Sequence, residues 1–435
     1  MNKKIGIRHE DKYELERRTA IPPFYAKKLI EENGYEVLVE KSKKRIFKDA
    51  EYEAIGAKLV DDMRDADVIF GVKEMPIDYF KADKTYVFFS HTVKGQKYNM
   101  PLLKNMMEKK CNLIDYEKIA EDDGRRIIFF GRFAGLAGMV NSLWSFGQRM
   151  KVKGLETPFV TMKQAHKYNS LEEIKNVISE IGASIAEKGF SKEIFPMVVG
   201  FTGYGNVSRG AAEILALFPV KEITPEELLV LKERDDLSNR VVYKVIFKEE
   251  HISKPIDKKV KFELQDYYNN PQKYKNAFEK FVPNLTILMN CMYWDASYPR
   301  IITKDFLEKL YSKEEPKLKV IGDVTCDPGG SIESTHTGTL IEDPVFVYNP
   351  ITRKPTMGFE GDGILEMAVD ILPSELPRES SEGFGQALEL LIPSIVSADY
   401  NLDFASVNLP LPIKRAVILY KGKLTPEYEY LKDFL

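Results

Sequence analysis

Residues 196–211, PMVVGFTGYGNVSRGA, contain the pattern that decides the fold of this 435-residue chain. An apolar, strand-like run leads into a glycine-rich turn, and the turn opens a helix-like segment. A dinucleotide-binding turn has this context: Gly203 permits the tight turn, and Gly205 lets the backbone approach a pyrophosphate that the helix N-terminus stabilises. The pattern predicts cofactor contacts at Gly203, Gly205, Asn206 and Val207.

The motif departs from the full fingerprint, because Ser208 stands where a third glycine is expected. A tight turn that binds no ligand therefore stays an alternative. The residue that contacts the ribose 2′-hydroxyl is expected about 20 residues further on, where the chain offers Glu222 and Thr224. An acid there would repel a 2′-phosphate, whereas Thr224 would not, and Lys221 could help to bind one. We therefore expect Thr224 to contact the cofactor, with NADPH preferred and NADH as the alternative.

Strand-like and helix-like runs alternate on both sides of this turn. Lys4–Ile7 and Tyr35–Glu40 are typical of strands, and Pro22–Asn33 between them is typical of a helix. A helix rich in small residues, Phe133–Met150, precedes the second group of strands, and its alanines and glycines favour close helix packing. This rhythm predicts an α/β protein with two Rossmann-like, doubly wound domains separated by a cleft.

The expected domains are not continuous in sequence. Residues 1–135 plus 365–435 are expected to form a substrate-binding and catalytic α/β domain, and residues 136–364 a dinucleotide-binding Rossmann domain. The chain crosses between them at 133–150 and 361–376, and we expect these segments to act as hinges of the cleft.

Composition and charge argue against several classes of protein. The net charge of −3 and the isoelectric point near 6.1 predict no nucleic-acid or anionic-membrane partner. No run approaches 18 apolar residues, so no membrane span is expected. The start, MNKKIGIRHE, lacks the apolar run of a signal peptide, and the expected location is the cytoplasm. Cys111, Cys291 and Cys326 form no CxxC pair, so no metal site or disulfide framework is expected.

Charged side chains follow two strand-like runs of the first domain. Lys73 ends one run in GVKEMP, and His91 ends the next in FFSHTVKGQ. Ligands of open α/β sheets bind beyond the carboxyl ends of strands, so these two residues are a plausible acid/base pair. A histidine with a purely structural hydrogen bond and a solvated lysine are the alternatives. An ordinary charged surface is the alternative for two arginine pairs, Arg17-Arg18 and Arg125-Arg126.

Nine segments together resemble a known family, in family order and over almost the whole chain. They are IRHEDKYELERRTAIPP, GVKEMP, YVFFSHTVKGQ, LIDYEKI, GRRIIFFGRFAGLAGM, FTGYGNVSRGA, NCMYWD, IGDVTCDPGGSIE and ILPSELPRESSEGFG. The chain resembles the lysine–2-oxoglutarate reductase domain of α-aminoadipic semialdehyde synthase. It is more distantly similar to fungal lysine-forming saccharopine dehydrogenase, alanine dehydrogenase and transhydrogenase. An alanine dehydrogenase-like fold is implied.

The resemblance also implies a role for each matching residue. Lys73 and His91 match the catalytic pair of the family. The implied substrate-binding residues are Arg18, Lys94, Gln96, Arg125 and Phe130. Arg126 matches a cofactor contact. The segments Asn290–Tyr293 and Asp323–Asp327 match the lining of the nicotinamide and substrate sites, which adds Cys291, Met292, Tyr293, Asp323 and Val324 to the expected cofactor-binding residues.

The implied function is an NADPH-dependent (or NADH-dependent) oxidoreductase acting on CH–NH bonds, which condenses L-lysine with 2-oxoglutarate to saccharopine. Two alternatives within the family are NAD-dependent oxidation of saccharopine in the lysine-forming direction and alanine dehydrogenase activity. A non-catalytic dinucleotide-binding regulator is the alternative from another class. The animal family members continue into a saccharopine-oxidising half, so a separate saccharopine-oxidising partner enzyme is a further expectation.

Overall fold

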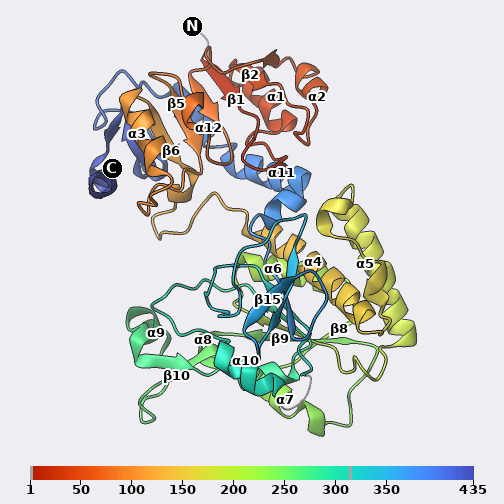
Figure 1. Ribbon diagram of the computed structural model, residues 1–435. Helices are drawn as coiled ribbons and strands as arrows, with labels where there is room; N and C mark the ends of the chain where they lie inside the picture. The colour runs from red at the N-terminus through yellow and green to blue at the C-terminus, as the bar shows by residue number, and fades with distance from the viewer. Residues whose placement is uncertain (1–2, 313–315) are drawn as a thin grey trace. The chain divides into compact units, whose positions relative to one another are not determined.

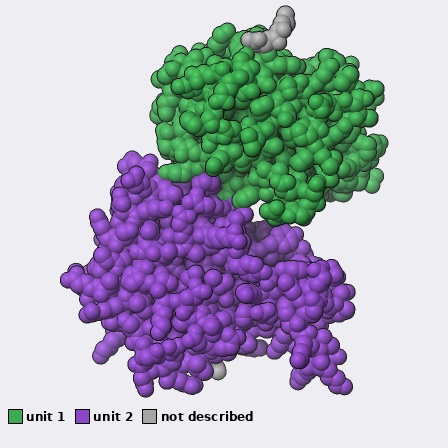
Figure 2. All heavy atoms as spheres, turned by 180° about the vertical axis from the view of Figure 1, so that it is seen from behind, with its two compact units in different colours: residues 1–130, 377–435 green, residues 131–376 purple. Residues whose placement is uncertain are grey.

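The computed structural model describes residues 3–312 and 316–435, which divide into two compact units (Figure 2). Unit 1 comprises the residues up to Phe130 together with Pro377–Leu435, and unit 2 comprises Gly131–Leu376. These boundaries differ from the expected 135/136 and 364/365. Helix α4 (Gly131–Val152) starts at the first boundary, and strand β16 (Ile364–Met367) pairs with a strand of unit 2.

Unit 1 is built on an eight-stranded sheet in the order β18-β17-β6-β5-β4-β1-β2-β3. The six strands from the N-terminal part are parallel, and β17 runs antiparallel to β6. The strands are β1 (Lys4–Ile7), β2 (Glu36–Glu40), β3 (Lys58–Val60), β4 (Val68–Phe70), β5 (Thr85–Phe88), β6 (Asn112–Asp115), β17 (Val417–Tyr420) and β18 (Lys423–Leu424). The central strands are apolar and buried, as expected for parallel strands covered on both faces.

The helices of unit 1 come from both ends of the chain (Figure 1). They are α1 (Pro23–Glu31), α2 (Asp49–Glu53), α3 (Met100–Glu108), α11 (Pro377–Leu388), α12 (Ile392–Ser397) and α13 (Leu411–Arg415). Helix α1 begins with a proline, whose missing N–H group costs nothing in the first turn of a helix. Strands β4 and β5 are parallel neighbours, and Phe70 at the end of β4 pairs with Val87 near the end of β5. The loops that follow them, which carry Lys73 and His91, therefore lie at the same edge of the sheet.

Unit 2 has a second eight-stranded sheet in the order β15-β14-β16-β13-β12-β7-β9-β8. Six strands are parallel, and β14 and β15 complete one edge in antiparallel pairing. The strands other than β16 are β7 (Val198–Thr202), β8 (Val220–Glu222), β9 (Val242–Phe247), β12 (Ile287–Asn290), β13 (Val320–Asp323), β14 (Val345–Asn349) and β15 (Lys354–Met357). The prediction of an α/β protein with two Rossmann-like domains is confirmed.

The remaining helices of unit 2 are α5 (Leu171–Lys188), α6 (Asn206–Leu215), α7 (Pro225–Leu229), α8 (Glu249–Ile252), α9 (Leu264–Asn269) and α10 (Lys304–Tyr311). A small two-stranded sheet pairs β10 (Ser253–Pro255) with β11 (Tyr274–Asn276). Within the residues described, no helix is both long and apolar enough to cross a membrane.

Helices α4 and α6 pack closely because glycines face the backbone of the partner helix. A Cβ atom on Gly135 would lie 1.9 Å from the carbonyl oxygen of Val207, and one on Gly210 would lie 2.1 Å from that of Arg132. Close packing of the small-residue helix, predicted from AGLAGM, is therefore confirmed. Gly210 thus serves packing of α6 against α4, whereas the third glycine of the fingerprint serves packing of the helix against the strand.

Candidate active site

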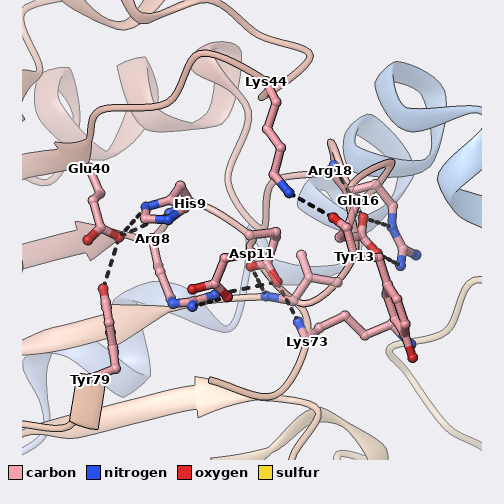
Figure 3. A network of polar contacts seen from close by, with 12 residues as sticks. Arg8, His9, Asp11, Tyr13, Glu16, Arg18, Glu40, Lys44, Lys73 and Tyr79 are labelled. Atoms are coloured by element: carbon pink, nitrogen blue, oxygen red, sulfur yellow. Dashed lines mark hydrogen bonds and ion pairs between the residues drawn. The ribbon is translucent and has the colours of Figure 1, made fainter. Parts of the chain in front are cut away.

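A buried carboxylate fixes the loop that carries Lys73. Glu10 accepts hydrogen bonds from the backbone N–H groups of Val72 at 2.7 Å and of Lys73 at 2.9 Å. Burial raises the pKa of Glu10, although the Arg8 guanidinium 3.7 Å away opposes this shift. The loop after β4 is therefore held by the segment that follows β1 (Figure 3).

The side chain of Lys73 lies in a charged and partly buried environment. Burial lowers the pKa of Lys73, and the positive charge of Arg18 lowers it further, while Glu16 and Glu74 oppose the shift. A depressed pKa leaves more of the lysine as neutral amine near neutral pH, and the neutral amine is the form that accepts a proton. Lys73 is therefore suited to proton transfer.

His91 is oriented by Glu74, the residue next to Lys73. The imidazole Nδ1 lies 2.6 Å from Oε1 of Glu74, and Nζ of Lys12 lies 2.7 Å from the same oxygen. Burial alone would raise the pKa of Glu74, but His91 and Lys12 lower it to about 2. His91 has a left-handed backbone with φ of 49°, and Asn99 donates a hydrogen bond to its carbonyl oxygen. With Nδ1 engaged, Nε2 is the ring nitrogen left for exchange with a ligand.

Arg18 is buried, and much of its donor capacity is already used. Its Nε and Nη2 groups donate to the two carboxylate oxygens of Glu16 at 2.7 and 2.6 Å. The guanidinium lies 4.3 Å from the ring centroid of Phe130, and that ring stacks on Phe384 at 4.7 Å. Nη1 takes no part in the pair with Glu16, so its N–H groups can donate to a substrate carboxylate. The structure brings Arg18, Phe130 and Lys73 into one region of unit 1.

The other predicted substrate residues lie in more open positions. Lys94 is exposed, and Gln96 is half-buried with a buried Oε1 atom that has no hydrogen-bond partner in the described part of the chain. The Arg125 side chain is 79% exposed and pairs with Asp123. Arg126, the predicted cofactor contact, pairs with Glu117 at 2.6 Å. The roles of these four residues stay predictions.

The glycine turn of unit 2 is open on the side that a pyrophosphate would approach. Gly203 has φ of 83°, and its N–H donates to the carbonyl oxygen of Phe247 at 3.2 Å. A Cβ atom added to Gly205 would meet nothing within 4 Å, and Asn206 starts the ten-residue helix α6 with an exposed side chain. Open backbone at the N-terminus of a helix of this length fits a dinucleotide phosphate.

A buried polar network ties together the strand ends behind this turn. Asn290 accepts from the Thr202 hydroxyl at 2.7 Å and donates to Asp323 at 2.8 Å and Ser331 at 2.7 Å. Asp323 also accepts from the Thr335 hydroxyl at 2.7 Å. These bonds fix the backbone of the predicted cofactor segments, in which Cys291 is buried, Met292 and Val324 are half-buried, and Tyr293 is 80% exposed.

Sequence reasoning missed Thr202, Ser331 and Thr335, because only the fold shows that they meet Asn290 and Asp323. The one available signal was the unusual density of small polar residues in the segment TCDPGGSIEST. Groups of at least three histidine, cysteine, aspartate or glutamate residues that could hold a metal ion are absent from residues 3–312 and 316–435.

Thr224 serves a local structural purpose at the end of β8. Its hydroxyl accepts from the backbone N–H of Glu227 at 3.1 Å, and the Glu227 carboxylate accepts from the N–H of Thr224 at 2.8 Å. This reciprocal capping box starts helix α7. The strand beside β7 is β9 rather than β8, with Thr202 paired to Phe247, so the predicted ribose contact lies one strand further from the turn than expected. Its cofactor role stays a prediction.

Known proteins resemble this chain in the sequence of its N-terminal part and in its fold. Residues 6–137 match the model of the alanine dehydrogenase/PNT N-terminal domain. The L-alanine dehydrogenase structure superposes with a TM-score of 0.62 at 17% identity, covering 99% of this chain and 100% of that one, which shows a shared fold.

Two relatives match nearly the whole chain. The α-aminoadipic semialdehyde synthase of Arabidopsis thaliana is 38% identical over 98% of this chain, which covers only 41% of that relative. This chain thus spans less than half the length of that relative. The lysine-forming, NAD(+) saccharopine dehydrogenase of Yarrowia lipolytica is 30% identical over 90% of this chain and 91% of its own length. This chain therefore belongs to the family of lysine-forming saccharopine dehydrogenases.

Proposed function

We propose that this protein is a nicotinamide-dependent oxidoreductase that condenses L-lysine with 2-oxoglutarate and reduces the product to saccharopine. The observation that carries the proposal is the cluster of Lys73, Glu74 and His91 at the carboxyl edge of the unit 1 sheet. Proton transfers of the condensation need an amine of lowered pKa and an oriented imidazole, and this cluster offers both. The names of the α-aminoadipic semialdehyde synthase and saccharopine dehydrogenase relatives support the substrate assignment.

The residues of unit 1 would handle protons and carboxylates. The ε-amine of lysine has an ordinary pKa near ~10.4 and must lose a proton before it attacks the ketone of 2-oxoglutarate. Lys73 accepts that proton, and His91 donates one to the hydroxyl group that leaves as water. Arg18, Lys94, Gln96, Arg125 and Phe130 are the proposed substrate-binding residues, with arginine suited to carboxylates.

The residues of unit 2 would bind the dinucleotide, which supplies a hydride to the imine when bound. Gly203 and Gly205 receive the pyrophosphate, and the first turn of α6 neutralises part of its charge through the backbone N–H groups of Asn206 and Val207. The proposed contacts further along the chain are Thr224, Cys291, Met292, Tyr293, Asp323 and Val324, together with Arg126 of unit 1. Both NADPH and NADH remain within this proposal.

The decisive assay follows oxidation of NADH and of NADPH with lysine plus 2-oxoglutarate, and separately with pyruvate plus ammonia. We expect turnover only with the first pair. Lys73→Met and His91→Gln should each lower kcat by about 10²–10⁴-fold. Turnover with pyruvate and ammonia alone would identify an alanine dehydrogenase. Tight dinucleotide binding without turnover in either assay would identify a regulator.

The reverse reaction, oxidation of saccharopine to lysine, uses the same groups in the opposite protonation states. We infer that both directions can be measured on this chain, and the ratio of their rates at fixed pH gives the preferred one. A cytoplasmic location and a separate saccharopine-oxidising enzyme stay predictions.

A further inference from the structure

The strand order of unit 2 changes which residue stands beside the glycine turn. In a Rossmann domain the acid that contacts the adenosine ribose follows the strand adjacent to the first one. Here the first strand is β7, which pairs with β12 on one side and with β9 on the other, whereas β8 occupies the edge of the sheet beyond β9. The Gly203 N–H bonds directly to the carbonyl oxygen of Phe247, the last residue of β9. The ribose-contacting position is thus expected just after Phe247.

Glu249 occupies that position, and two tyrosines hold its carboxylate. The Tyr204 hydroxyl, which belongs to the glycine turn itself, lies 3.3 Å from both Glu249 oxygens. The Tyr268 hydroxyl donates to Oε1 at 2.7 Å. Burial and the Glu249 carboxylate raise the pKa of Tyr268, so its phenol stays a donor. A carboxylate offers about four acceptor sites, and two phenols leave room for ribose hydroxyls.

The candidates at the end of β8 are engaged elsewhere. Glu222 pairs with Lys244 at 3.0 Å, and Thr224 is committed to the capping box of α7. Charges of both signs flank Glu249 in the sequence: the exposed Lys248 precedes it and the exposed Glu250 follows it. Glu226 lies 3.8 Å from Nε2 of His251, two residues after Glu249.

We propose that Glu249, positioned by Tyr204 and Tyr268, accepts hydrogen bonds from the adenosine ribose and makes the protein select NADH over NADPH. The 2′-hydroxyl of NADH donates to this carboxylate, whereas the 2′-phosphate of NADPH meets like charge. The inference rests on the proposed dinucleotide-binding function, and it reverses the preference that Thr224 at the expected position would give.

The test is direct binding of NADH and NADPH to the full chain, measured by titration calorimetry without substrates. The wild type should bind NADH at least about tenfold more tightly than NADPH, since a hydrogen bond to a charged group contributes on this scale. Glu249→Ser should weaken NADH binding about tenfold and abolish the preference. Glu249→Arg should reverse it. Tyr268→Phe should reduce the preference by a smaller factor without altering binding of NADPH.

Two further variants separate Glu249 from its surroundings. Glu250→Ser removes the same charge from the next residue and should leave the preference unchanged within about twofold. Glu222→Ser tests the rival position at the end of β8. A wild-type preference for NADPH, an unchanged ratio in Glu249→Ser, or a shift in Glu222→Ser alone would overturn the assignment of Glu249. Failure of the wild type to bind either dinucleotide would instead reject the proposed function.

Discussion

Nδ1 of His91 lies 2.6 Å from Oε1 of Glu74, and this contact joins the loops that follow two adjacent strands, β4 and β5. The same carboxylate oxygen accepts from Lys12. Glu74 is 8% exposed, so water competes little for these contacts. Glu74 therefore sets the tautomer and direction of the imidazole without needing to touch substrate.

Glu74→Gln should lower kcat on the order of tenfold or more, with a smaller change in KM, because it disturbs proton transfer rather than binding. The pKa of Glu74, about 2, lies below its ordinary value of 4.5. The stability from this carboxylate is thus present above pH 4.5 and is lost as pH falls through about 2. Urea titrations from pH 7 to pH 3 should show a shallower loss in the variant. An equal loss in both proteins would contradict this role.

Arg18 and Arg125 offer a contrast between a buried and an exposed arginine. Arg18→Ala leaves the buried Glu16 carboxylate without its bidentate partner and should destabilise unit 1 by about 3–5 kcal/mol. Arg125→Ala removes only an exposed pair with Asp123 and should leave the midpoint of urea unfolding unchanged. Urea unfolding measures both changes.

The double variant Glu16→Gln, Arg18→Met removes both charges of the buried pair together. It therefore tests the substrate role of Arg18 without leaving the Glu16 carboxylate behind. It should recover part of the stability and still raise the Michaelis constant for the keto-acid substrate, while dinucleotide affinity stays unchanged. A Michaelis constant equal to that of the wild type would show that Arg18 is a structural partner of Glu16 and no more.

Much of unit 1 could be predicted from the sequence because its signals are local. The strand at Lys4–Ile7 and helix α1 depend on apolar runs and on prolines at the helix start that the sequence displays directly. Lys73 and His91 follow from the rule that ligands gather at the carboxyl ends of parallel strands. The strand order of unit 2 could not be predicted in this way, because β8 and β9 differ in pairing partner rather than in local pattern. The importance of Glu10, Glu74 and Glu249 likewise appears only when distant segments meet.

A buried acid pair in unit 2 provides a prediction at alkaline pH. The Thr335 hydroxyl lies 2.7 Å from Asp323 and 3.1 Å from Glu366. The Thr335 hydroxyl has a single hydrogen and can donate it to only one of the two carboxylates. If it donates to Asp323, a hydrogen bond to Glu366 requires that Glu366 is protonated and donates to the Thr335 oxygen. Burial, together with the charge of Asp323, raises the pKa of Glu366 from 4.5 to about 8.

The folded protein should therefore keep a proton on Glu366 that the unfolded chain loses above pH 4.5. This contribution to stability is full below pH 4.5 and is lost as pH rises towards about 8. Glu366→Gln cannot titrate, and its amide can donate to Thr335, so its stability relative to the wild type should rise between pH 6 and pH 9. Glu360→Gln, at an exposed glutamate of the same unit, is the control. Parallel pH profiles for wild type and Glu366→Gln would contradict the assignment.

Two glycines near the start of helix α6 separate binding from packing. Gly205 has an extended backbone with φ of −77° and open space at its Cβ position, so alanine fits there without strain. A Cβ atom on Gly210 would lie 2.1 Å from the carbonyl oxygen of Arg132, which belongs to the backbone of α4. Gly205→Ala should keep the stability of the wild type within about 0.5 kcal/mol, whereas Gly210→Ala should lose about 1–3 kcal/mol through overpacking.

NADH affinity should distinguish the same two variants in the opposite way from stability. A methyl group on Gly205 occupies space that a pyrophosphate needs, so NADH affinity should fall about tenfold or more in a protein that is still folded. Gly210→Ala should bind NADH normally at temperatures where it remains folded, because the added methyl group faces α4. Calorimetric titration beside thermal unfolding measures both quantities on each variant. Unchanged NADH affinity in Gly205→Ala would mean that the turn is a strand-to-helix connection without a phosphate, and the dinucleotide would have to be sought elsewhere.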